Sequence, residues 1–183
     1  MKKLYIRISK FLSYILRHRP NKFGLELDSN GYASLSEVLI ILNIKFKEIN
    51  ITRQTLEDII EKSDKRRFEL IEHKIKAYYG HSIEKKIRLK EVLSFPPILY
   101  HGTTLNAYYK IKLEGLIKKN RQYVHLSDDV RDAFLVGKRR SKNPIILKID
   151  VKSAHQEKVK FYKSGDMYLA DYIPPKFISR IYE

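Results

Sequence analysis

The chain is a strongly basic sequence of 183 residues with a mass of 21.8 kDa. It has 37 Lys and Arg residues against 21 Asp and Glu, a formal net charge of +16, and no cysteine. The missing cysteine excludes disulfides, thiolate zinc sites and a cysteine nucleophile, and it fits a reducing compartment, so we expect a cytoplasmic protein. The length predicts a folded protein of one or two domains. The charge predicts that it binds a polyanion, and the alternative explanation of the charge is the lysine-rich composition of an A/T-rich genome.

The chain has an apolar N-terminal stretch and an uncharged run at 92–109, and neither predicts a membrane segment. Arg7 and Lys10 interrupt the N-terminal stretch, which a secretion signal keeps uncharged. The uncharged run 92–109 contains Pro96 and Pro97, which a spanning helix of about 20 apolar residues would not carry. We therefore expect a soluble protein without membrane contact.

An apolar stripe at helical spacing predicts the first helix. The stripe consists of Ile8, Phe11, Leu12, Ile15 and Leu16. Pro20 ends this helix, so Arg17 and His18 lie in its last turn, where the helix dipole favours cations.

Residues 25–34 predict a β-hairpin. The segments 25–27 and 32–34 flank Asp28-Ser29-Asn30-Gly31, a turn of residue types that tolerate positive φ. Two short helices are expected next. Ser34 with Glu37 is a capping-box pattern at the start of one, and Thr52 begins the other.

From Arg67 the pattern becomes alternating and aromatic. It predicts a strand at 68–71, a polar turn at Glu72-His73 and a return strand at 74–79. Helices followed by a basic two-stranded wing are typical of winged-helix modules, which are mostly nucleic-acid binders. This is an analogy at the level of the fold.

The segment 93–97 is the best candidate for a domain boundary, because paired prolines favour extended chain and end regular elements. We expect an N-terminal domain of residues 1–92, a linker at 93–97 and a C-terminal domain of residues 98–183. The second half predicts strands at 98–100, 123–126, 145–151 and 167–169, and helices at 105–113 and 129–136. The expected fold class is α+β.

Three segments combine Arg or Lys with residues that interrupt regular structure: 16–20, 64–68 and 137–140. Each could bind phosphate, because a guanidinium group offers a planar donor fork that matches phosphate oxygens, whereas lysine supplies a point charge. Arginines that meet from several segments would favour phosphoryl chemistry. For any one segment alone, a solvated basic face is the alternative.

Two predicted strand ends carry histidine. The first ends in His101-Gly102-Thr103, where a glycine lets a ligand approach the backbone and His and Thr can bind ribose hydroxyls. In the second, alternation places His125 and Ser127 on one face and Val124 on the other. Together they predict one ligand cleft, with two satisfied, half-buried histidines as the alternative. We expect no metal site, because the six histidines show no i,i+4 pair.

In chain order, these and neighbouring motifs resemble those of one enzyme family. They are Leu-Arg-His at 16–18, Asp-Ser-Asn-Gly-Tyr at 28–32, Lys-Arg-Arg-Phe at 65–68, Gly-His-Ser at 80–82, His-Gly-Thr at 101–103, Val-His-Leu-Ser at 124–127 and Gly-Lys-Arg at 137–139. Any single motif is weak support, but their order and spacing from about Ile8 to Ile181 are specific. By these motifs the chain resembles the NAD-dependent RNA 2'-phosphotransferases.

This resemblance implies a fold and a reaction. The implied fold is an N-terminal winged-helix-like RNA lobe and a C-terminal NAD lobe similar to ADP-ribosyltransferase toxins. The family acts in RNA repair and removes the internal 2'-phosphate left at a tRNA splice junction. That phosphate attacks the nicotinamide ribose and expels nicotinamide, which leaves 2'-phospho-ADP-ribosylated RNA. A ribose hydroxyl then attacks the phosphodiester, giving 2'-OH RNA and ADP-ribose 1'',2''-cyclic phosphate.

The resemblance also implies the residues that act. The family's catalytic set falls on Arg17, His18, Arg67 and Arg139, with Lys65 associated with the second step. The NAD-site motifs fall on His101, Gly102, Thr103, His125 and Ser127. We therefore expect NAD as a consumed co-substrate, an RNA with a 2'-phosphate as the partner, no metal, and a monomer.

The chemistry of the reaction explains why these motifs contain few acidic residues. A phosphate monoester has a second pKa of about 6, so it is already anionic at about pH 7 and needs no base. The first step instead needs positive charge to hold the nucleophile in line, which suits Arg17, Arg67 and Arg139. The second step moves protons between two oxygens, which suits His18, with an ordinary pKa of about 6.5.

Two departures from the family pattern leave the affinity for NAD or RNA open. Lys76-Ala77-Tyr78-Tyr79 replaces a segment that usually carries Gln before Gly-His-Ser, and Asp166 replaces Asn.

Two alternative functions also stay open. One is an ADP-ribosyltransferase that acts on nucleic-acid phosphates without the second step, and the other is a non-catalytic RNA-binding protein.

Overall fold

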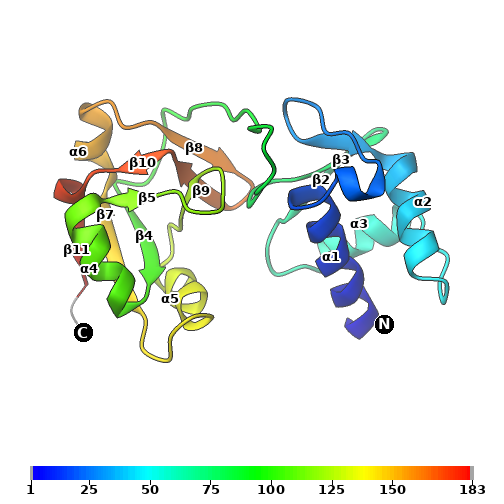
Figure 1. Ribbon diagram of the computed structural model, residues 1–183, viewed down its shortest axis with the longest axis horizontal. Coiled ribbons are helices and arrows are strands. Elements are labelled where there is room, and N and C mark those ends of the chain that lie inside the picture. The colour runs from blue at the N-terminus through cyan, green and yellow to red at the C-terminus, as the bar shows by residue number, and fades with distance from the viewer. Residues whose placement is uncertain (1, 182–183) are drawn as a thin grey trace. The chain divides into compact units, whose positions relative to one another are not determined.

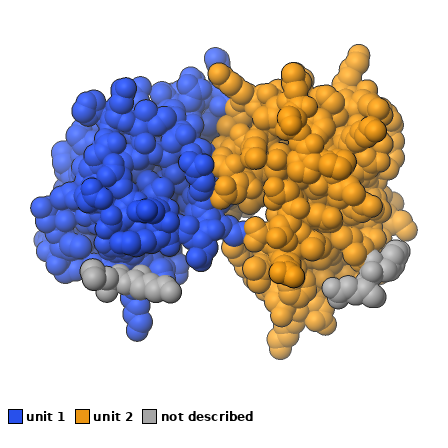
Figure 2. Space-filling model, turned by 180° about the vertical axis from the view of Figure 1, so that it is seen from behind, with its two compact units in different colours: residues 1–88 blue, residues 89–183 orange. Residues whose placement is uncertain are grey.

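The structure is a computed structural model that describes residues 2–181. The chain divides into two compact units, residues 1–88 and 89–183 (Figures 1 and 2). Each unit has its own hydrophobic core. Helices and several small antiparallel sheets alternate along the chain, which is consistent with the expected α+β class. Within the described residues, no helix is both long and apolar enough to cross a membrane.

Helix α1 (Lys2–Arg17) begins the first unit and confirms the predicted apolar stripe. Its fully buried side chains are Ile8, Leu12, Ile15 and Leu16. Arg17 is the last residue of the helix, and the N–H of His18 still donates to the carbonyl of Tyr14 at 3.0 Å. The chain then forms the short 3-10 helix η1 (Asn21–Phe23).

Two capped helices follow, as predicted. Helix α2 (Leu35–Lys45) begins after Ser34, whose hydroxyl accepts from the N–H three residues further on at 3.5 Å. Helix α3 (Arg53–Glu61) begins after Thr52, which forms a reciprocal capping box with Thr55. These caps satisfy N–H groups that have no acceptor inside the helix.

The strands of the first unit form a three-stranded antiparallel sheet in the order β1-β3-β2. The strands are β1 (Tyr32–Ser34), β2 (Phe68–Ile71) and β3 (Lys74–Ala77). The predicted pair after Arg67 is confirmed as β2 and β3, although β3 ends at Ala77.

The hairpin predicted for residues 25–34 is wrong. Its second segment, β1, pairs with β3, and residues 25–27 form no strand. The carboxylate of Asp28 accepts from the N–H groups of Asn30 and Tyr32 at 2.9 and 3.0 Å, so a side chain closes the turn. Leu25 and Leu27 are buried in the core, because tertiary packing places them there instead of on a strand.

Over its described residues, 89–181, the second unit contains three small antiparallel sheets and four short helices, one of them a 3-10 helix. Figure 1 shows their arrangement within this unit. One sheet has the order β11-β7-β4, with β4 (Ile98–Thr103), β7 (Ile145–Asp150) and β11 (Ile178–Arg180). Another has the order β6-β9-β8, with β6 (Val124–Leu126), β8 (Phe161–Ser164) and β9 (Met167–Ala170). The third pairs β5 (Leu116–Ile117) with β10 (Tyr172–Ile173). The helices are α4 (Leu105–Glu114), α5 (Val130–Lys138), α6 (Val151–Gln156) and the 3-10 helix η2 (Pro175–Phe177).

All strands and helices predicted for this half are present, with boundaries that differ by a few residues. The segment predicted as a linker, 93–97, lies inside the second unit. The ring of Phe95 contacts those of His155 and Phe161 at centroid distances of 4.8 and 5.6 Å. The N–H of Val92 donates to the carbonyl of Phe161 at 2.9 Å. These contacts tie the chain to the second core before the prolines.

Gly102 lets α5 pack directly on β4, and Gly137 lets the same helix pack on Pro144, just before β7. A Cβ atom on Gly102 would stand 1.9 Å from the carbonyl oxygen of Ala133, and one on Gly137 would stand 2.6 Å from Cβ of Pro144. The backbones of the strand and the helix therefore approach more closely than a side chain permits. This contact places the end of α5 beside the end of β4.

We expect Gly102→Ala to lower the free energy of unfolding by about 3 kcal/mol or more, because the methyl group overlaps backbone atoms that cannot rotate away. Urea unfolding followed by circular dichroism measures the loss. Gly24→Ala is the matched control: its Cβ meets no atom within 4 Å, although φ is +68°, so only about 1 kcal/mol of backbone strain is expected. Equal losses for the two variants would contradict this explanation.

Candidate active site

In the first unit, Arg17 is held by two aromatic rings and a carbonyl. Its Nη2 donates to the carbonyl of Arg67 at 3.3 Å. Its Cζ lies 5.0 Å from the ring centroid of Tyr79 and 5.7 Å from that of Phe68. Arg17 is only 8% exposed. A guanidinium group is weakly hydrated for a cation and stacks on aromatic faces, so these rings can hold it at low solvent exposure.

His18 is connected to a segment that follows β3. Its Nδ1 lies 2.8 Å from Oγ of Ser82, and the N–H of Ser82 donates to the carbonyl of Arg17 at 2.9 Å. His18 is half-buried and Ser82 is exposed. These two bonds join the end of α1 to residues that are more than sixty positions away in the sequence.

Arg67 directly precedes β2. Its carbonyl accepts from Arg17 and also from the N–H of Tyr78, at 3.0 Å. Its Nη1 lies 3.5 Å from the carbonyl of Lys65, in the loop between α3 and β2. The first unit thus brings Arg17, His18 and Arg67 together, with Lys65 in the adjoining loop.

The second unit joins the two predicted histidine strand ends. Tyr100 of β4 and Ser127, just after β6, exchange backbone hydrogen bonds of 2.7 and 2.9 Å. The Nδ1–H of His101 donates to the carbonyl of His125 at 2.9 Å, since a carbonyl can only accept. The side chains of Thr103 and Ser127 are buried polar groups at this place.

Arg139 caps the C-terminus of α5. It follows Gly137, which packs against Gly102, so the end of α5 lies beside the strand that carries His101 and Thr103. The space next to Gly102 in which a side chain would lie is filled by α5. The close approach of this helix therefore explains the glycine, and the approach of a ligand to its backbone stays a prediction. The predicted catalytic residues are thus distributed over both units, Arg139 in the second and the others in the first.

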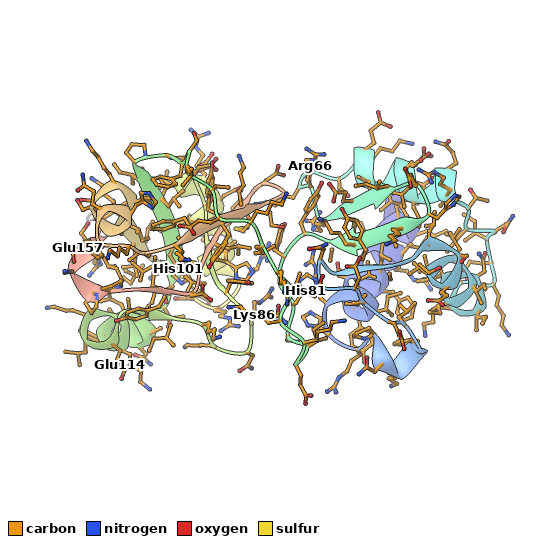
Figure 3. All side chains as sticks on the ribbon, turned by 90° about the horizontal axis from the view of Figure 1, so that it is seen from above. Arg66, His81, Lys86, His101, Glu114 and Glu157 are labelled. Carbon is orange, nitrogen blue, oxygen red and sulfur yellow. The ribbon has the colours of Figure 1, made fainter. Side chains whose placement is uncertain are left out.

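His101 lies among the strands of the second unit (Figure 3). Burial lowers the pKa of its imidazole below the ordinary 6.5, although its bond to the carbonyl of His125 acts in the opposite direction. At neutral pH His101 is therefore neutral, with Nδ1–H as a donor and Nε2 as an acceptor.

This pKa shift predicts a pH dependence of stability. Because the folded protein binds the proton of His101 less tightly than the unfolded chain does, the contribution of the neutral group is fully present above pH 6.5 and is lost as the pH falls below it. We expect the urea concentration at the midpoint of unfolding to decrease when the pH is lowered from about 7.5 to about 5.5. The fall should be smaller in His101→Asn, whose amide can replace the Nδ1–H donor. An equal fall in both proteins would contradict this assignment.

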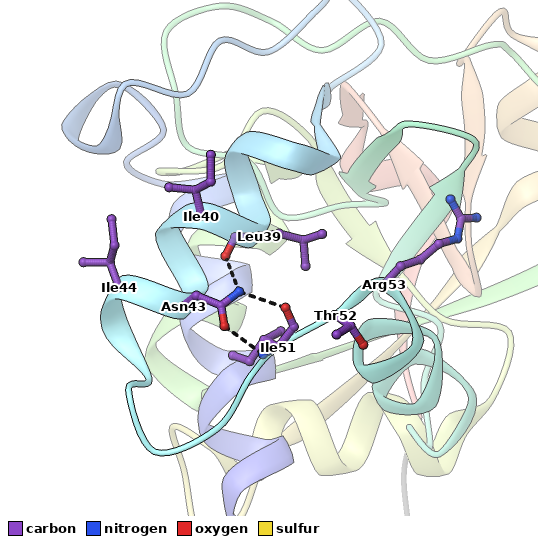
Figure 4. A pocket seen from close by; sticks show the side chains of 7 residues that line it. All are labelled: Leu39, Ile40, Asn43, Ile44, Ile51, Thr52 and Arg53. Atoms are coloured by element: carbon purple, nitrogen blue, oxygen red, sulfur yellow. Dashed lines mark hydrogen bonds between the residues drawn. The ribbon is translucent and has the colours of Figure 1, made fainter.

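An apolar groove of about 620 Å³ lies along α2 (Figure 4). It is lined by Leu39, Ile40, Asn43, Ile44, Ile51, Thr52 and Arg53. The amide of Asn43 donates to the carbonyls of Leu39 and Ile51 at 2.9 and 2.8 Å and accepts from the N–H of Ile51 at 2.8 Å. The groove contains no predicted catalytic or NAD-binding residue, so it is separate from the candidate site.

Among residues 2–181, no group of three or more histidine or carboxylate side chains could hold a metal ion.

Comparison with known proteins relates nearly the whole chain to one family. A family model described as RNA 2'-phosphotransferase, Tpt1 / KptA family, matches residues 3–170. A protein of Bacillus thuringiensis subsp. konkukian named "Probable RNA 2'-phosphotransferase" is 46% identical over 178 residues, which cover 97% of this chain and 96% of the relative. Proteins with the same name from Acetivibrio thermocellus and Fusobacterium nucleatum are 44% and 42% identical over 175 and 176 residues. These alignments cover 95% and 94% of this chain, and 96% and 97% of the relatives.

Proposed function

Since the chain belongs to the RNA 2'-phosphotransferase family and is thus a transferase, we propose that it removes an internal 2'-phosphate from RNA and consumes NAD in doing so. The products are 2'-OH RNA, nicotinamide and ADP-ribose 1'',2''-cyclic phosphate, and a tRNA splice junction is the proposed source of the substrate. The observation that carries the proposal is the hydrogen bond from the Arg17 guanidinium to the backbone carbonyl of Arg67, 50 residues away, with His18 joined to the carbonyl of Arg17 through Ser82.

In the first step, Arg17 and Arg67 hold the RNA 2'-phosphate. One of its oxygens attacks the anomeric carbon of the nicotinamide ribose, the glycosidic C–N bond breaks, and the bonding electrons leave with nicotinamide. The phosphate needs orientation rather than deprotonation, because it is already anionic at about pH 7. Positioned guanidinium groups supply that orientation and offset the charge. Arg139 belongs to the catalytic set that the family resemblance implies.

In the second step, His18 moves protons. The neighbouring hydroxyl of the ADP-ribose attacks phosphorus and loses its proton, while the bond to the RNA 2'-oxygen breaks and that oxygen gains a proton. One imidazole can accept the first proton and donate the second. Because Nδ1 of His18 is bonded to Ser82, the transfer falls to Nε2. Lys65 adds positive charge in the loop before Arg67.

The second unit is the proposed NAD-binding part. The neutral imidazole of His101 and the hydroxyls of Thr103 and Ser127 are uncharged hydrogen-bonding groups, which suit ribose hydroxyls better than a phosphate. His125 and Gly102 belong to the same pair of strand ends. We further propose that the first unit is a winged-helix-like RNA lobe and that the second is an ADP-ribosyltransferase-like NAD lobe. The proposed location of the protein is the cytoplasm.

The test is a product analysis with a short RNA that carries one internal 2'-phosphate, incubated with the protein and NAD. We expect nicotinamide, 2'-OH RNA and the cyclic phosphate, and no nicotinamide from the matching RNA without the 2'-phosphate. A folded protein that releases no nicotinamide would overturn the proposal. A stable ADP-ribosylated RNA would support the transferase without the second step. Salt-sensitive RNA binding that NAD does not change would support the non-catalytic alternative.

A further inference from the structure

We propose that residues 78–82 form a brace that positions two catalytic residues of the first unit, with Tyr79 acting on Arg17 and Ser82 acting on His18. The brace follows β3 and contains no residue of the predicted catalytic set. This inference rests on the proposed function, because it assigns these residues to two different steps of that reaction.

Tyr79 restricts the side chain of Arg17. The Cζ–centroid distances of 5.0 Å to Tyr79 and 5.7 Å to Phe68 lie within the range of about 6 Å in which a cation is attracted to a ring face. An arginine side chain loses rotamer entropy when it is ordered, so contacts that limit its rotation beforehand prepare it to bind a phosphate. Phe68 belongs to the core, whereas Tyr79 is half-buried. Tyr79 is therefore the ring whose role can be separated from folding.

The start of the brace is fixed to the sheet and to Arg67. The N–H of Tyr78 donates to the carbonyl of Arg67, which also accepts from Nη2 of Arg17. The hydroxyl of Tyr78 donates to the carboxylate of Glu69, on β2, at 3.0 Å. One carbonyl thus connects the brace with both arginines, and Tyr79 follows directly from this anchored residue.

Ser82 makes two bonds with different roles. Its N–H donates to the carbonyl of Arg17 and so satisfies one of the last carbonyls of α1, which have no donor inside the helix. Its hydroxyl bonds Nδ1 of His18 at 2.8 Å and so sets the rotation of the ring and the nitrogen that transfers protons. Ser82→Ala removes only the second bond, because the backbone N–H stays.

The two roles predict that, in single-turnover reactions, loss of the Tyr79 ring slows the first step and loss of the Ser82 hydroxyl slows the second. Nicotinamide release measures the first step, and the decay of ADP-ribosylated RNA measures the second. We expect Tyr79→Leu to slow the first step about tenfold, and Tyr79→Phe to stay within about twofold of the unmodified protein because it keeps the ring. We expect Ser82→Ala to slow the second step about tenfold and the first by less than about twofold.

Two variants of the same unit control for general damage. Tyr5→Leu removes a ring that lies 5.8 Å from Nζ of Lys62, and Ser63→Ala removes a hydroxyl that donates to the carbonyl of Ile59 at 2.6 Å. Both should leave both steps within about twofold. Equal slowing of both steps by Tyr79→Leu and Ser82→Ala, or equal loss in Tyr79→Leu and Tyr79→Phe, would overturn the proposal.

A measurement without catalysis separates this inference from the proposed function. In ¹⁵N NMR spectra, Ser82→Ala should change the Nδ1 and Nε2 shifts of His18, and Ser63→Ala should not. Tyr79→Leu should reduce the ring-current shift of the Arg17 guanidinium to the part that Phe68 contributes. Unchanged signals in Ser82→Ala and Tyr79→Leu would overturn the brace, whereas changed signals in a protein that releases no nicotinamide would support the brace and overturn only the proposed function.

Discussion

Arg67→Ala should slow nicotinamide release by about 100-fold or more while changing RNA affinity only a few-fold. The guanidinium group is assigned to the reacting phosphate, and removal of one such group costs about 100- to 1,000-fold in rate. RNA affinity depends on many phosphate contacts, of which this substitution removes one. Rapid-quench kinetics with the 2'-phosphorylated RNA measures the first effect, and filter binding over a series of salt concentrations measures the second.

Arg66→Ala is the matched control for this prediction. Arg66, labelled in Figure 3, is the neighbouring arginine. Its Cζ lies 5.9 Å from the ring centroid of Tyr78, and it does not belong to the implied catalytic set. We expect its nicotinamide release to stay within about threefold of the unmodified protein. The assignment of Arg67 to the phosphate would be wrong if the two variants lost activity equally, or if Arg67→Ala lost RNA affinity as strongly as turnover.

His18→Ala should stop the reaction after its first step. A general acid or base contributes about 100- to 10,000-fold, so ADP-ribosylated RNA should accumulate while nicotinamide release stays within a few-fold. A gel that separates substrate, ADP-ribosylated RNA and product measures both rates in one reaction. Arg17 keeps its carbonyl bond to the backbone of Ser82 in this variant, so the first step retains its phosphate-binding group.

His73→Ala is the corresponding control, because His73 lies in the exposed turn between β2 and β3 and its backbone carbonyl, which the substitution keeps, accepts from the N–H of Leu35 at 2.8 Å. We expect both steps to be unchanged within about twofold. Equal slowing of both steps in His18→Ala would remove the proton-transfer role from His18.

Local patterns of the sequence predicted most of the helices and strands. The apolar stripe of α1 and the caps at Ser34 and Thr52 each depend on residues within a few positions of one another. The predicted hairpin at 25–34 is wrong because the pairing of its second segment depends on residues far away in the sequence. The partner of β1 is β3, about forty residues later, and no local signal reports such a pairing.

The candidate site divides in the same way. The motifs identified the family, and the structure places Arg17, His18 and Arg67 of the first unit in contact through Ser82 and a shared carbonyl. Tyr79 and Ser82 were not predicted as positioning residues. Each had one signal in the sequence: Tyr79 departs from the family pattern, and Ser82 ends the Gly-His-Ser motif.

By itself, the sequence determined the charge, the residue types that suit a phosphate, the capped helices and the family, because these depend on composition and on short spacings. Only the tertiary structure decided which ring stacks on Arg17, which hydroxyl holds His18 and why Gly102 has no side chain. These are contacts between chain segments far apart in sequence, and their geometry follows from packing of the whole unit.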